Sequence, residues 1–91
     1  MIMIKEQITT IGNSIMTPEA KILMLVNNFK ESGKIRFKKE FYDSTGISRQ
    51  YMRMVEHEDR RFTSTQIKSV CKEYNINANW IFDLEKNIFR Q

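Results

Sequence analysis

The chain has 91 residues, enough for one domain and little beyond it. Hydrophobic residues make up 41% of it and charged residues 29%, which excludes a wholly disordered polar chain. One cysteine excludes an intramolecular disulfide, and with one histidine it leaves no Cys/His set for a structural zinc, so we expect neither a metal nor a cofactor. The longest apolar run, Ile22 to Val26, is far shorter than a membrane span, and the first residues lack a secretory signal. We therefore expect a soluble, cytoplasmic protein with no membrane partner.

The basic charge of the chain is concentrated in its middle. Fifteen Lys and Arg residues against eleven Asp and Glu residues give a net charge of +4. Residues 34–61 contain eight of the bases and five of the acids, so most of the excess falls there. This distribution predicts that a polyanion such as nucleic acid binds to the central part of the chain.

The first predicted helix covers residues 17–32. Thr17 provides a capping hydroxyl, Pro18 favours the first helical turn and Glu19 suits the positive end of the helix dipole. Gly33 provides the stop, because glycine adopts the left-handed conformation that follows many helices. One apolar face has the helical spacing i, i+3, i+4, i+7, formed by Ile22, Leu25, Val26 and Phe29.

Two short helices are predicted next, on either side of Gly46. The first covers residues 36–44, and Phe37 and Phe41 are expected to share its apolar face because they are four residues apart. The second has Ser48 as its N-cap and extends to residue 56. Its inward residues, three apart, are Met52 and Val55.

Two further helices complete the predicted fold. Thr63 or Ser64 caps the fourth, on whose apolar stripe Cys71 is expected to be a buried thiol. Asn77 caps a short fifth helix with the apolar residues Trp80, Ile81 and Leu84, of which Trp80 is expected in the core.

The sequence thus predicts an all-α fold, a compact five-helix bundle at residues 17–91 preceded by an N-terminal extension at residues 1–16. Within the extension, Ile8, Ile11 and Ile15 fit either a helix or a short extended arm.

Residues 38–55 have the pattern of a helix-turn-helix. Gly46 stands where a tight corner between two helices requires positive φ, and Ile47 is expected to fill the angle between them. The outward face of the second helix is then short and polar, and it consists of Ser48, Arg49, Gln50 and Arg53.

Residues 37–56, FKKEFYDSTGISRQYMRMVE, resemble the helix-turn-helix of phage-repressor-like regulators of the Cro/CI or xenobiotic-response-element type. The later segment, KSVCKEYNINANWIFDLEKNIF, resembles the stretch of this family in which a helix is followed by an asparagine-rich turn and a tail that ends in an aromatic residue. The residues that match this pattern are Asn75, Asn77, Asn79, Trp80, Glu85 and Phe89. The resemblance implies a transcriptional repressor, in a bacterial cell or a phage-infected host, that acts as a homodimer on a pseudo-palindromic DNA operator. As a single domain, such a repressor is expected to act by occlusion and without a small-molecule ligand.

The resemblance also implies which residues contact DNA. Arginine can pair with guanine, glutamine with adenine, and an apolar side chain can touch a thymine methyl group. The implied base contacts are Ser48, Arg49, Gln50 and Met54. The implied phosphate contacts are Lys34, Arg36, Lys38, Lys39, Arg53, Arg60 and Arg61. The N-terminal amides of the helix at 36–44 form a further expected anion site.

Some residues leave a second interpretation open. Tyr42 stands where the family usually has a small residue. His57-Glu58 replaces the family's usual Asn-Gly, and with Asp59 it places two acids in the loop after the recognition helix. With an exposed Met54 and an apolar N-terminal arm, these differences fit a helix-turn-helix used for protein interaction, as in a phage adaptor or an antitoxin-like partner. Arg53 has its own alternative, an ion pair with Glu56 or Asp43. The sequence contains no recognisable catalytic set, so we expect no enzyme.

Overall fold

Five helices and no β-strand are formed by residues 16–90, the part of the chain that the computed structural model describes. This mostly helical, compact domain confirms the predicted fold class at that level. The prediction of an extension at residues 1–16, with its isoleucines, lies outside the described residues except for Met16. The helices are α1 (Pro18–Ser32), α2 (Lys38–Thr45), α3 (Arg49–Glu56), α4 (Ser64–Tyr74) and α5 (Ala78–Ile81).

Four of the five helices begin at the side-chain cap that the sequence predicts. Each cap oxygen accepts a backbone N–H of the first turn at 3.0–3.1 Å. For α4, the cap is Thr63 rather than Ser64. The caps of α1, α3, α4 and α5 are Thr17, Ser48, Thr63 and Asn77.

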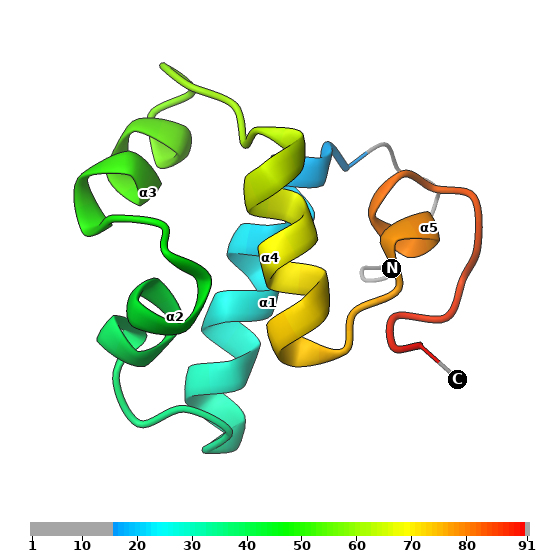
Figure 1. Cartoon of the computed structure of the whole chain (residues 1–91), viewed down its shortest axis with the longest axis horizontal. Coiled ribbons are helices and arrows are strands. Elements are labelled where there is room, and N and C mark those ends of the chain that lie inside the picture. The colour runs from blue at the N-terminus through cyan, green and yellow to red at the C-terminus, as the bar shows by residue number, and fades with distance from the viewer. Residues whose placement is uncertain (1–15, 91) are drawn as a thin grey trace, which may run out of the picture.

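The predicted apolar faces meet in one core. In Figure 1, α1 and α4 cross at the centre of the molecule, with α2 and α3 on one side and α5 on the other. Tyr74 of α4 stacks on Phe29 of α1 and on Phe41 of α2, with ring centroids 4.9 and 5.3 Å apart. The predicted inward residues of α3, Met52 and Val55, and the thiol of Cys71 are buried as well.

The chain after α5 turns back toward the end of α4. An isolated antiparallel bridge pairs Ile76 with Phe89, and the N–H of Asn77 donates to the carbonyl of Ile88 at 2.7 Å. The side chain of Asn77 also donates to Glu85 and to the carbonyl of Asn87. Asn77, the cap of α5, therefore holds the final segment against the bundle.

Three predictions about apolar residues are wrong. Helix α2 begins at Lys38 rather than Arg36, so Phe37 precedes it in an extended conformation and is 65% exposed instead of sharing a face with Phe41. Leu84 lies beyond the end of α5 and is 72% exposed. Trp80 is half-buried at the edge of the core rather than inside it.

None of the helices in residues 16–90 combines the length and the apolar character that crossing a membrane requires.

Candidate nucleic-acid interface

A tight corner joins α2 to α3. Gly46 has φ 76° and ψ 10°, and its N–H donates to the carbonyl of Tyr42 at 2.9 Å. The hydroxyl of Thr45 donates to the carbonyl of Phe41 at 2.7 Å and accepts the N–H of Ile47 at 3.4 Å. Ile47 is 1% exposed, so its side chain fills the angle between the helices as the sequence predicts.

The outer face of α3 is polar and exposed. Met52 and Val55 are buried on the opposite face, and Ser48 and Gln50 are exposed, although the hydroxyl of Ser48 also caps the helix. Arg49, Gln50 and Arg53 line one shallow hollow on this face. The implied base contacts Ser48, Arg49 and Gln50 thus lie together with Arg53 on one surface.

Arg53 forms no ion pair with either Glu56 or Asp43, both of which lie in the described part of the chain. Its alternative role as an intramolecular partner is therefore not realised. Met54, by contrast, is half-buried instead of fully outward. The turn after α3 folds back beside it, because the N–H of Asp59 donates to the Met54 carbonyl at 2.8 Å.

A second feature of this side is a groove of about 790 Å³ between the end of α1, α2 and the start of α3. We call it the basic groove. Two aromatic and four cationic side chains contribute to its lining: Phe37, Tyr42, Lys30, Lys38, Lys39 and Arg49. Lys30 is absent from the residues implied by the resemblance. No local sequence signal distinguishes it, because only the packing of α1 against α2 brings it to the groove.

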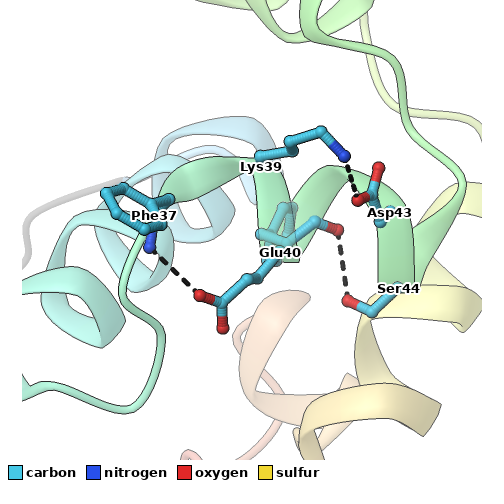
Figure 2. A network of polar contacts seen from close by, with 6 residues as sticks. Phe37, Lys39, Glu40, Asp43 and Ser44 are labelled. Carbon is cyan, nitrogen blue, oxygen red and sulfur yellow. Dashed lines mark hydrogen bonds and ion pairs between the residues drawn. The ribbon is translucent and has the colours of Figure 1, made fainter.

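Polar contacts along α2 modify the charge of this region (Figure 2). Lys39 donates to Asp43 at 2.7 Å, and this hydrogen bond, with the attraction between the two charges, raises the pKa of Lys39. Because Asp43 offsets the charge of Lys39, Lys39 is the least suited of the groove cations to bind an external phosphate.

The anion site expected at the N-terminus of α2 needs correction. The carboxylate of Glu40 accepts the backbone N–H of Arg36 at 3.0 Å and that of Phe37 at 3.3 Å, and Figure 2 shows it turned back toward Phe37. The carboxylate of Glu40, in the first turn, therefore already accepts hydrogen bonds from the backbone N–H groups just before the helix. An external anion would meet a carboxylate there.

The remaining implied phosphate contacts are exposed but dispersed. Arg36 precedes α2, and the ammonium of Lys34 lies 5.7 Å from the ring centroid of Phe29. Arg60 and Arg61 lie in the loop between α3 and α4 and line a separate hollow with acids that include Glu58. The structure therefore groups Lys38, Lys39 and Arg49 in one groove, and places Arg60 and Arg61 elsewhere.

The turn after α3 has a left-handed residue that is not glycine. Glu58 has φ 63°, its N–H donates to the Val55 carbonyl at 3.0 Å, and the Asp59 N–H donates to Met54. These two bonds form a Schellman motif, in which glycine is the usual residue at the position of Glu58.

Comparison with protein-family models, with curated proteins and with solved structures finds no match to this chain. Its function is therefore inferred from its own residues. Within residues 16–90, no three His, Cys, Asp or Glu side chains are grouped so that they could hold a metal ion.

Proposed function

We propose that the chain is a DNA-binding transcriptional regulator that contacts the major groove of duplex DNA with the outer face of α3. The supporting observation is that Ser48, Arg49 and Gln50 are exposed at the start of a helix whose other face is buried. A bidentate contact of Arg49 to guanine, or of Gln50 to adenine, discriminates by about 1–3 kcal/mol. Met54 is the weaker candidate, since only part of its side chain is accessible.

The proposed type is the phage-repressor-like repressor, acting by occlusion and without a small-molecule ligand. The left-handed conformation of Glu58 supports it, because the family's usual Asn-Gly would place glycine at this position. One short helix contacts only a few base pairs, so we propose a homodimer on half-sites about 34 Å apart. Arg53 and Arg36 are proposed to contact phosphates on either side of the base contacts.

The phosphate contacts are tested by titrating a labelled duplex of random sequence at several salt concentrations. Wild-type affinity is expected to fall steeply with salt, because bound phosphates release counterions. Arg53→Gln and Arg36→Gln are each expected to weaken binding and reduce the salt slope by about 1. The control is Lys72→Gln, an exposed cation of α4, which should match wild type. Absence of duplex binding at low salt would contradict the proposal.

A second candidate is a module that binds another protein. It is favoured by three large apolar residues that follow α5 and are 45–72% exposed: Phe82, Leu84 and Phe89. Leu84→Ser should leave duplex binding unchanged under the first proposal. The second candidate is favoured by two results together. The wild type binds no duplex DNA at low salt, and Leu84→Ser abolishes a self-association or partner binding that the wild type shows.

A further inference from the structure

We propose that the basic groove binds single-stranded nucleic acid by stacking an unpaired base on Phe37 and holding the neighbouring phosphates with Lys30, Lys38 and Arg49. This function differs from duplex recognition by the outer face of α3, with which it shares Arg49. Proteins that bind single strands combine a cationic groove with aromatic platforms for bases, and both are present here.

Phe37 is the most informative residue of the groove. It precedes α2 in an extended conformation, with φ −132° and ψ 147°, and this directs it away from the core that Phe41 enters. The residue is 65% exposed, and its neighbours in the sequence are two cations, Arg36 and Lys38. An exposed ring at a cationic groove is poorly explained by stability, because burial would stabilise it more. A stacked base would cover it.

Tyr42 provides a second aromatic side chain in the same lining. It is half-buried, packs against the core and stands one turn further along α2 than Lys38. Tyr42, in α2, and Phe37, the residue that precedes α2, therefore both border the groove. Tyr42 is the less accessible of the two and would form one side of the groove, while the exposed ring of Phe37 would stack on the base.

The charges favour a nucleic-acid strand. Lys30, Lys38 and Arg49 form no ion pair with another described residue, whereas Lys39 is paired with Asp43, the acid of the lining. Three cations are thus available to the phosphates of a bound strand. An acidic peptide would satisfy the same charges, but it would leave the ring of Phe37 without a flat partner.

The groove also favours an unpaired strand over a duplex. Stacking on Phe37 needs access to the face of a base, and in a double helix both faces of an internal base are covered by its neighbours. Arg49 borders both the groove and the hollow on α3. A single strand in the groove and a duplex on α3 are therefore expected to compete through this residue.

The test is an anisotropy titration of a labelled 12-nucleotide oligothymidylate at low salt. Phe37→Ala is expected to weaken its binding about 5- to 150-fold, and Phe37→Tyr, which keeps the ring, should bind like wild type. Leu84→Ala is the matched control, because Leu84 is as exposed but lies beyond α5. Lys30→Gln should weaken binding and lower its salt dependence. Thermal unfolding should show that each variant folds.

Three results would overturn the proposal: no binding of oligothymidylate, equal binding by wild type and Phe37→Ala, or an equally strong competition by a 12-residue polyglutamate. Duplex titrations with the same variants separate this proposal from the previous one. Phe37→Ala should leave duplex affinity unchanged. If the wild type binds oligothymidylate but not duplex DNA, only the α3 proposal is rejected. If the wild type binds duplex DNA but not oligothymidylate, only the groove proposal is rejected.

Discussion

The ammonium group of Lys21 lies under the ring of Trp80, 4.9 Å from its centroid, and donates to the carbonyl oxygen of the same residue at 2.6 Å. The two residues are 59 positions apart, and Lys21 is only 5% exposed. Its ammonium also pairs with the exposed carboxylate of Asp83. A lysine on the buried side of α1 thus fastens α5 to the bundle.

Lys21→Met should destabilise the domain, since it keeps most of the aliphatic volume but removes the ammonium. The carbonyl of Trp80 keeps the backbone N–H of Asp83 but loses the hydrogen bond from the charged ammonium. A hydrogen bond to a charged group contributes about 1.5–3 kcal/mol to the free energy of unfolding, and we expect a loss at the lower end of this range. Urea unfolding followed by the fluorescence of Trp80 measures this change. Lys68→Met, at an exposed position of α4, is the control and should unfold like wild type. Equal destabilisation by both variants would show that the buried contact is not responsible.

Glu58→Gly should stabilise the domain. The left-handed φ of 63° is unfavourable for a residue with a Cβ atom, and glycine removes that strain, a gain of about 1 kcal/mol. Glu58→Ala is the matched control, because it removes the same charge and keeps the Cβ. Thermal unfolding should rank glycine above alanine. If the α3 proposal holds, both variants should bind duplex DNA more tightly than wild type, because a carboxylate near phosphates is lost.

Tyr51→Phe should loosen the loop that follows α3. The Tyr51 hydroxyl donates to the carbonyl of Arg61 at 2.5 Å, while its ring packs on Phe62 with centroids 6.4 Å apart. The phenylalanine keeps the packing and loses the hydrogen bond, a cost of about 0.5–1.5 kcal/mol in the free energy of unfolding. Tyr42→Phe is the control, since its hydroxyl has no hydrogen bond to a described residue. If chemical denaturation finds the two variants equally stable, the contact to Arg61 contributes nothing.

Stability should fall in alkaline solution partly through Cys71. Burial raises the pKa of this thiol above its ordinary value of 9.0, and the charge of Arg90 lowers it by less. The unfolded chain therefore releases the proton first, so the free energy of unfolding decreases as pH rises above about 9. Urea unfolding at pH 8 and pH 10 should show a larger loss for wild type than for Cys71→Ala. Equal losses would mean that this thiol does not contribute.

Local signals in the sequence predict that five helices exist and identify the side-chain caps of four of them. The caps at Thr17, Ser48 and Asn77 depend only on neighbouring residues, and the spacing of Ile22 with Phe29 depends on one helix. Such features could be predicted because the physical cause and the residue lie within two turns of each other.

The remaining features depend on contacts between distant residues or on where a helix begins. The spacing of Phe37 and Phe41 suggests one face, but the extended backbone at Phe37 separates them. The burial of Lys21 is decided by Trp80, and the entry of Lys30 into the basic groove by the packing of α1 on α2. No pattern within a short window contains this information.

Selection from a pool of random duplexes tests the central claim, sequence recognition by α3, most directly. We predict that the wild-type chain enriches a motif of two symmetric half-sites with centres about 34 Å apart. Arg49→Ala and Gln50→Ala should each relax the preference at one position of the half-site, at a cost of about 1–3 kcal/mol for the preferred base. The claim is contradicted if the wild type enriches no motif, or if both variants enrich the wild-type motif unchanged.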